Sequence, residues 1–115
     1  MTEGTRPGRV SEEFREILAE EIPKLKDPRV GFVTVTSVRV TPDLRKAFVR
    51  YTVLGDDKAK AGTKAALRSA RAHLRGVLGH QVRLKFLPEL EFEEDDTLDA
   101  LERIDRLLKE ARPGE

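Results

Sequence analysis

Four basic residues in the middle of the sequence have a spacing that suits phosphate binding. Lys64, Arg68, Arg71 and Arg75 follow one another at intervals of three or four residues. On a helix this spacing places all four side chains along one face. Arginine suits the role because its planar guanidinium group can bind a phosphate through two hydrogen bonds and can stack on a base. We therefore predict that these four residues form a basic ridge that contacts a polyanion such as RNA.

The charges of the chain are unevenly distributed around this basic ridge. Residues 1–57 carry ten bases and ten acids, residues 58–88 carry eight bases and no acid, and residues 89–115 carry four bases and eleven acids. The three blocks therefore have net charges of 0, +8 and −7. A clustered basic segment attracts phosphate even in a chain whose net charge is only +1. The alternative, an ordinary solvated helix face, fits less well because such faces usually mix the two signs.

Six further basic residues are secondary candidates for RNA contact. Two lie on the polar face of the strand predicted after the ridge, two at a hairpin turn and two in an N-terminal arm. They are, in that order, Arg83 and Lys85, Arg45 and Lys46, and Arg6 and Arg9. The five phenylalanines and the one tyrosine mostly fall on predicted core positions. We therefore expect recognition through shape and phosphate contacts rather than through a platform of stacked bases.

The sequence holds little that indicates catalysis. Its two histidines, His73 and His80, belong to no metal-binding or nucleophile motif, and the absence of cysteine excludes thiolate ligands. The acids of residues 93–96 have the composition of a magnesium site, but a strand-to-helix turn with capping acids explains them more simply. No glycine-rich loop precedes a Lys-Ser or Lys-Thr pair. We expect no enzymatic activity, metal, cofactor or small-molecule substrate.

Length and composition favour one domain in the cytoplasm. A chain of 115 residues can form one modest core. Its first residues are polar and contain no apolar run as long as a signal peptide or a membrane span. We therefore expect a soluble intracellular monomer without membrane contact.

Three segments have the periodicity of helices that must position these residues. The first runs from Val10, with Ser11 as its expected cap, and Pro23 should end or kink it. The second begins after its expected cap Asp57, carries the basic ridge and continues to Gly79, and it comprises the two central helices of the chain. The third begins near residue 97 and has acids early and bases late, as the helix dipole favours.

Three other segments alternate between apolar and polar residues, as strands do. They are residues 32–40, 47–54 and 82–93, and the last has the clearest alternation. The apolar phase changes within the first strand, which predicts a bulge near Thr36 and Ser37. Pro88 in the last strand indicates a sheet edge or a bulge there, because proline cannot donate a ladder hydrogen bond.

The elements follow the order α-β-β-α-α-β with one further helix, which matches the KH fold in its type II arrangement. The segments KDPRVGFVTVTSVRVTPDL (26–44) and LRGVLGHQVRLKFLPELEFEEDDTL (74–98), with the alanine-rich helix between them, also resemble the bacterial ribosome-binding factor A family. Together they span nearly the whole chain. Their most specific features are the Asp-Pro-Arg-x-Gly element and the Arg-Leu-(x)3-Pro-Glu-Leu-x-Phe strand.

The resemblance implies both a fold and a function. The fold is α+β, a single KH type II-like domain with a three-stranded sheet and helices packed on one side. The function is binding to free small (30S) ribosomal subunits, with assistance in late maturation and 5′-end processing of 16S ribosomal RNA. We divide the chain into a flexible N-terminal arm (1–9), the KH-like domain (10–96) and an amphipathic C-terminal helix with its tail (97–115). The alternative is a non-catalytic protein-interaction module that docks through an acidic C-terminal helix.

One position departs from the family pattern. Family members replace the phosphate-clasping Gly-x-x-Gly of KH domains with an Ala-x-Gly kink between the two central helices, and the matching residues here are Ala70, Arg71 and Ala72. Alanine disfavours a left-handed backbone, so we expect a milder kink or a conformation that alanine tolerates. The sequence GVLG at residues 76–79 also spells Gly-x-x-Gly, but its two central residues fit the apolar core stripe. A phosphate clasp there is the less favoured alternative.

Overall fold

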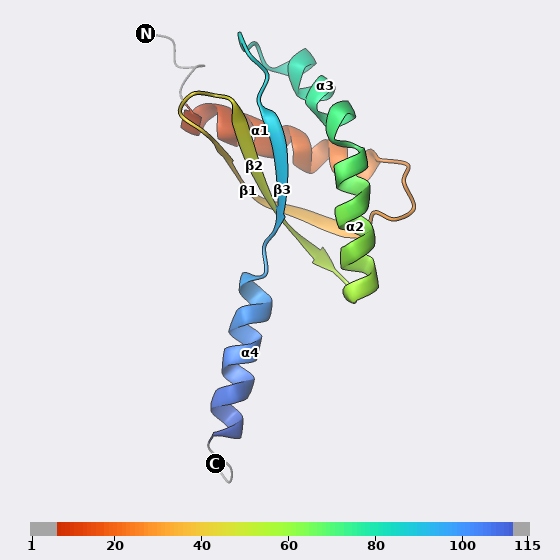
Figure 1. The fold of residues 1–115 in the computed structure, drawn as a ribbon, viewed down its shortest axis with the longest axis vertical. Coiled ribbons are helices and arrows are strands. Elements are labelled where there is room, and N and C mark those ends of the chain that lie inside the picture. The colour runs from red at the N-terminus through yellow and green to blue at the C-terminus, as the bar shows by residue number, and fades with distance from the viewer. Residues whose placement is uncertain (1–6, 112–115) are drawn as a thin grey trace.

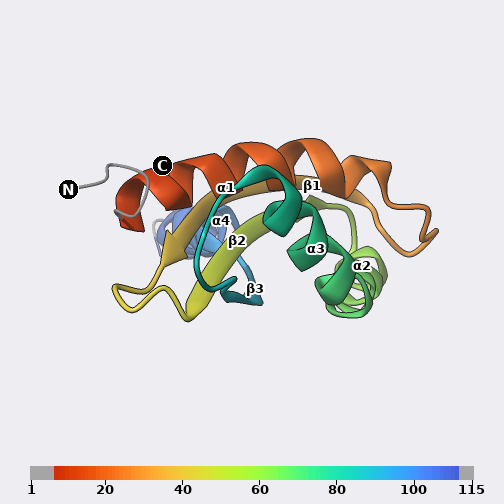
Figure 2. The same cartoon turned by 90° about the horizontal axis from the view of Figure 1, so that it is seen from above.

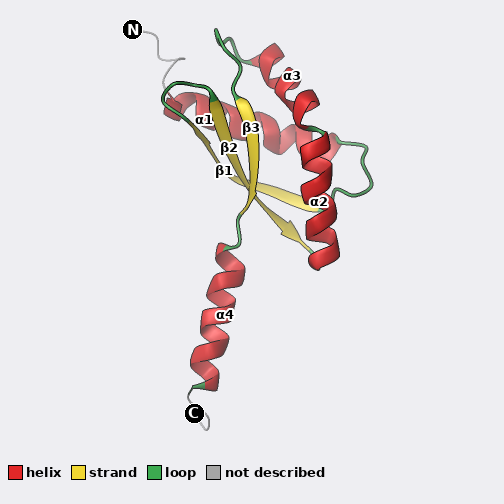
Figure 3. Cartoon of the chain, in the orientation of Figure 1, coloured by secondary structure: helices red, strands yellow, loops and turns green. Residues whose placement is uncertain are grey.

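The computed structural model describes residues 7–111, and its elements have the predicted order (Figures 1 and 3). They are α1 (Pro7–Glu21), the short 3-10 helix η2 (Ile22–Lys24), β1 (Phe32–Val40), β2 (Lys46–Leu54), α2 (Asp57–Ser69), α3 (Arg71–Gln81), β3 (Glu89–Glu94) and α4 (Thr97–Glu110). The sheet has the order β1-β2-β3, in which β1 and β2 are antiparallel and β2 and β3 are parallel. The predicted α+β class and three-stranded sheet are thus confirmed.

One face of the sheet packs against α1, α2 and α3. The helix α1 runs along the sheet, and α2 lies beside one end of it (Figure 2). Because side chains alternate between the two faces of a strand, every second residue of β2 is buried while its neighbours point outward. The buried side chains form one core, whose largest fully buried members are Tyr51, Phe14, Leu18, Ile22, Leu67, Leu74, Leu78 and Leu90.

The helix α1 begins earlier than the sequence indicated. It starts at Pro7 rather than at Val10, so residues 7–9 are helical and do not belong to an arm, whereas residues 1–6 lie outside the described part. Ser11 is not the cap, because its hydroxyl accepts a hydrogen bond from the backbone amide of Val40 in β1 at 3.0 Å. As predicted, the helix ends before Pro23, which lies in η2.

The bulge predicted in β1 is confirmed. The pairing of β1 with β2 shifts between Val35 and Ser37, so that Thr36 has no partner residue on β2. This extra residue brings Val38 and Val40 back to the buried face of the sheet. It also turns the Thr36 hydroxyl outward, where it donates a hydrogen bond to Asp95 at 3.2 Å.

The bounds of α2 and α3 differ slightly from the expected ones. The cap of α2 is Asp56, whose carboxylate accepts a hydrogen bond from the amide of Ala59 at 2.9 Å, and not Asp57. The two helices meet at Ala70. The end of α3 lies at Gln81, two residues after the predicted cap Gly79.

The long strand predicted for residues 82–93 is wrong in its first half. The strand β3 covers only Glu89–Glu94, and Phe86, predicted to face the core, is 65% exposed. The parallel register explains the difference, because Glu89 pairs with Lys46, the first residue of β2. The preceding residues lie beyond the end of β2 and have no strand to pair with. Pro88 is buried at this boundary, and β3 is an edge strand, as Pro88 indicated.

The helix α4 extends away from the sheet and is tied to it at its start (Figure 1). The backbone amide of Asp95 donates to the carbonyl of Tyr51 at 2.6 Å, and the Asp95 carboxylate accepts bonds from the amide and hydroxyl of Thr97. These bonds from Thr97 are the main cause that lowers the pKa of Asp95. Among the described residues, no helix has the length and apolar character needed to cross a membrane.

Candidate nucleic-acid interface

The first half of the basic ridge is free to bind a ligand. Lys64 and Arg68 lie one turn apart on α2, and both side chains are exposed. Within the part of the chain that the structure describes, neither side chain takes part in an ion pair or a hydrogen bond. Four residues advance an α-helix by about 6 Å. The two cations therefore present adjacent, unneutralised charges that can each bind a phosphate.

The second half of the basic ridge is already engaged within the protein. Arg71 lies on α3 with its guanidinium group 3.7 Å from the carboxylate of Glu91 in β3. Arg75 donates hydrogen bonds to the carbonyls of Pro88 at 3.1 Å and Leu87 at 2.6 Å, and it lies 3.7 Å from the carboxylate of Glu89. Arg75 thus holds the chain that enters β3, a role that its position in the sequence does not reveal.

The cations predicted to extend the ridge along a strand lie in irregular chain instead. Arg83 and Lys85 precede β3, and both are exposed. The ammonium group of Lys85 lies 5.6 Å from the centre of the Phe86 ring. Arg83 and Lys85 remain candidate RNA contacts, but they do not lie on a strand face as predicted.

The other secondary candidates are separate from the first half of the ridge. Arg45, with a side chain 83% exposed, and Lys46 lie at the hairpin turn between β1 and β2. Arg45 and Arg75 line a hollow of about 510 Å³ at that turn. Arg9 lies in the first turns of α1, where its guanidinium group is 3.4 Å from Glu13, and both views place this end of α1 far from α2 (Figures 1 and 2). Arg6 lies outside the described residues.

The junction of α2 and α3 has a backbone conformation that alanine can adopt. Ala70 has φ −86° and ψ 0°, which needs no glycine. Its amide donates to the carbonyl of Ala66 at 2.9 Å, and its carbonyl accepts from the amide of Leu74 at 2.9 Å. Ala72, where family members have glycine, lies within α3 and does not have a positive φ. The bend between α2 and α3 therefore does not require glycine at position 72.

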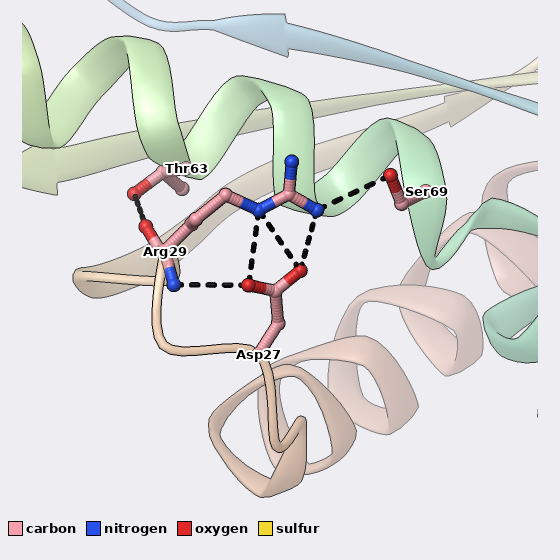
Figure 4. A network of polar contacts seen from close by, with 4 residues as sticks. All are labelled: Asp27, Arg29, Thr63 and Ser69. Atoms are coloured by element: carbon pink, nitrogen blue, oxygen red, sulfur yellow. Dashed lines mark hydrogen bonds and ion pairs between the residues drawn. The ribbon is translucent and has the colours of Figure 1, made fainter.

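A network around Asp27 and Arg29 holds the loop before β1 against α2 (Figure 4). The Arg29 guanidinium group donates to the Asp27 carboxylate at distances from 2.7 to 3.2 Å, and the Arg29 amide donates to it at 2.9 Å. These hydrogen bonds lower the pKa of Asp27 to about 2. The same guanidinium group donates to the Ser69 hydroxyl at 3.3 Å. The network thus reaches the last residue of α2, directly before the junction.

The buried hydroxyl of Thr63 joins the same loop to α2. It accepts a hydrogen bond from the amide of Gly31 at 3.0 Å and donates one to the carbonyl of Arg29 at 3.4 Å. A side chain at Gly62 would place its Cβ 3.3 Å from that carbonyl. The Asp-Pro-Arg-x-Gly element and the glycine in α2 therefore let the loop and the helix approach closely. The motif was recognisable in the sequence, but its contact with α2 was not.

The other candidate sites in the sequence, which are the Gly-x-x-Gly sequence, the histidines and the acidic cluster, do not form a ligand site in the described residues. Residues 76–79 lie inside α3 with Leu78 in the core, so this Gly-x-x-Gly sequence forms no loop that can clasp a phosphate. His73 and His80 are exposed on α3. Over residues 7–111, no group of three or more acidic, histidine or cysteine side chains is arranged to hold a metal ion.

Comparisons with known proteins agree on one family. Residues 6–108 match the family model of ribosome-binding factor A. The ribosome-binding factor A of Geobacter sulfurreducens is 48% identical over 106 residues, which cover 91% of this chain and 90% of that protein. The corresponding protein of Acidothermus cellulolyticus is 44% identical over 116 residues, which cover 100% of this chain and 77% of that protein.

Solved structures give the same result. The crystal structure of ribosome-binding factor A from Thermus thermophilus has a TM-score of 0.69 and 32% identity, and the match covers 76% of this chain and 94% of that one. A homology model of the Thermus thermophilus factor, fitted into a cryo-electron microscopy map of its complex with the 30S subunit, has a TM-score of 0.64 and 33% identity. That match covers 74% of this chain and 90% of that one.

Proposed function

The chain belongs to the ribosome-binding factor A family, and on that premise we propose that it binds the free small ribosomal subunit as an assembly factor. The observation that carries this proposal is the similarity to the Thermus thermophilus factor fitted into a 30S complex. We extend the proposal to late maturation of 16S ribosomal RNA, including processing of its 5′ end. The factor acts in the cytoplasm, as a monomer when free, by binding and without chemistry of its own.

The free half of the basic ridge, Lys64 and Arg68, supplies the phosphate contacts in this proposal. Both cations are exposed on α2, and neither has an ion-pair partner among the described residues. Phosphate contacts position a protein on RNA and release counterions, which favours binding. Arg71 and Arg75 contribute less directly, because carboxylates and carbonyls already occupy their guanidinium groups.

Docking of a protein partner through α4 is the second candidate, and one observation favours it. Four apolar side chains of α4 are more than half exposed: Leu101, Ile104, Leu107 and Leu108. The helix itself is not strongly acidic, since Thr97–Glu110 contains four acids and three bases. Most of the acids in the C-terminal block lie in β3 and the turn after it. A partner would therefore bind the apolar face of α4 rather than its charge.

Sedimentation of tagged protein through a gradient of cell lysate tests the proposed function. We expect the wild type with free small subunits and depleted from translating ribosomes. The variant Lys64→Gln/Arg68→Gln should leave the small-subunit fraction at a lower salt concentration than the wild type, because it has fewer phosphate contacts. A wild type that stays at the top of the gradient at low salt contradicts the proposal.

A second variant in the same gradient separates the two candidates. Leu101→Ser/Leu108→Ser removes apolar surface from α4 without touching the core, because both side chains are exposed. Loss of association in this variant, with unchanged association in the Lys64→Gln/Arg68→Gln variant, favours protein docking through α4.

A further inference from the structure

The hollow beside the hairpin of β1 and β2, here called the hairpin hollow, has the size of a ligand site. Its volume is about 510 Å³. Pockets that hold small organic ligands usually measure about 300 to 1,000 Å³. Its lining comes from the hairpin turn (Asp43, Leu44 and Arg45), from α3 (Arg75) and from the chain that enters β3 (Phe86, Leu87 and Glu89). The hairpin hollow therefore has room for one nucleotide.

Hydrogen bonds hold these three segments together. The backbone amide of Glu89 donates to the carbonyl of Arg45 at 2.8 Å, and Arg75 donates to two carbonyls of the chain that enters β3. Leu44 has φ 59°, the only positive φ of a residue other than glycine within residues 7–111, and its amide donates to the carbonyl of Thr41 at 2.8 Å. Such a conformation persists only where the surroundings hold it. The hairpin hollow is therefore formed before any ligand binds.

Phe86 supplies an aromatic wall that is open to a ligand. Its side chain is 65% exposed, and the ammonium group of Lys85 lies 5.6 Å from the centre of its ring. A nucleobase can stack on such a ring, because every base has a flat aromatic face. Lys85 is exposed and has no ion-pair partner among the described residues, so it can bind the phosphate beside a stacked base.

The carboxylates of the hairpin hollow suit a base rather than a phosphate. Asp43 and Glu89 balance the charges of Arg45 and Arg75, so the lining has no formal net charge. The side chain of Glu89 is 61% exposed. Bases carry amino and imino groups that donate hydrogen bonds, and a carboxylate accepts them. A base can therefore enter the hollow while its phosphate stays at the rim, near Lys85.

We propose that the hairpin hollow binds one unpaired nucleotide of ribosomal RNA, with its base stacked on Phe86 and its phosphate beside Lys85. The nucleotide must be unpaired, because neighbouring bases cover the faces of a paired base within a helix. This inference rests on the proposed binding to ribosomal RNA and adds a second contact. Lys64 and Arg68 do not line the hairpin hollow, so the two contacts can be tested separately.

The test compares Phe86→Ala with the wild type on two probes, an RNA strand of about eight nucleotides and a strand of equal length with abasic sugars throughout. Both probes carry the same phosphates, so a difference between them isolates the bases. We expect the wild type to bind the strand with bases more tightly. Phe86→Ala should weaken that binding about fivefold to tenfold, as the loss of one stacked base does. Its affinity for the abasic strand should change by less than about twofold.

Phe32→Ala is the matched control. Phe32 is 80% exposed and is the first residue of β1, so it lies at the opposite end of that strand from the hairpin. Both rings are exposed, so neither substitution removes a core side chain, and circular dichroism checks that both variants fold. Phe32→Ala should leave both affinities unchanged.

The variant Phe86→Trp gives a second readout at the site itself. The chain contains no tryptophan, so the emission of this variant comes from position 86 alone. The larger ring still allows stacking, and affinity for the strand with bases should be retained. That strand should quench the emission and the abasic strand should not, whereas Phe32→Trp should respond to neither.

The inference is overturned if Phe86→Ala weakens binding of both strands equally or of neither, or if Phe32→Ala has the same effect. It is also overturned if Phe86→Ala loses association with purified small subunits while it binds both strands like the wild type, because the ring would then contact a ribosomal protein. A wild type that binds small subunits without preferring the strand with bases overturns the inference alone. A wild type that binds neither small subunits nor either strand contradicts the proposed function as well.

Discussion

The two halves of the basic ridge have the same sequence pattern but different surroundings. Lys64 and Arg68 are exposed on α2 and have no ion-pair partner among the described residues, whereas Arg71 and Arg75 reach the acidic strand β3 and the chain that enters it. Helical spacing determines that four cations share a face, but the neighbouring strand determines which of them remain available. The spacing of the cations therefore predicts that they share one face, but only their tertiary contacts show which of them are available to bind phosphate.

Arg75→Gln should have the largest effect on stability among the ridge substitutions. It removes two charged hydrogen bonds to the carbonyls of Leu87 and Pro88. A hydrogen bond to a charged group contributes about 1.5 to 3 kcal/mol, so we expect a loss near the lower end of that range, about 1.5 kcal/mol, because Arg75 is partly exposed. Urea unfolding measures this loss. Lys64→Gln should change the free energy of unfolding by less than about 0.5 kcal/mol, and equal losses would contradict the division of the ridge.

Asp27→Asn should destabilise the protein at neutral pH and have no effect in strong acid. The pKa of Asp27 is lowered to about 2 from an ordinary value of 3.8, so the folded state favours the charged carboxylate. That contribution is fully present above the ordinary pKa and is lost as the pH falls from about 4 to about 2. The difference in unfolding free energy between wild type and variant should therefore shrink over this window. A difference that stays constant down to pH 2 would show that the charge of Asp27 contributes nothing.

Among the substitutions expected to destabilise the protein, Ala72→Gly should have the smallest effect. The bend lies at Ala70 in a conformation that alanine adopts, and Ala72 is helical, so glycine relieves no strain. We expect a loss of about 0.5 kcal/mol, because glycine is a poorer helix former than alanine. A rise in the melting temperature would mean that the junction prefers the glycine of other family members.

The sequence was most informative where one local pattern decided the outcome. The phase change in residues 32–40 predicted the bulge, and Pro23 predicted the end of α1. The sequence was misleading where a segment's structure depends on residues that are distant in the chain. Residues 82–88 alternate like a strand, but β2 starts at Lys46 and offers them nothing to pair with.

The candidate site follows the same rule. Spacing along the sequence was enough to place Lys64 and Arg68 together on α2. The bonds of Arg75 to residues 87 and 88, and the contact of Arg29 with Ser69, depend on segments that meet only after folding. No pattern around Glu91 indicated that it would face a cation of the basic ridge.

The salt dependence of binding to purified small subunits tests the central claim most directly. Lys64→Gln/Arg68→Gln removes two phosphate contacts, so the log–log slope of affinity against salt should become shallower by about 1.4 to 1.8. The control Arg103→Gln/Arg106→Gln removes two exposed cations from α4 and should leave the slope nearly unchanged. Both variants lose the same charge, so net charge cannot explain a difference between them. Equal changes in the two variants, or an unchanged slope in the first, would contradict the assignment of the phosphate contacts to α2.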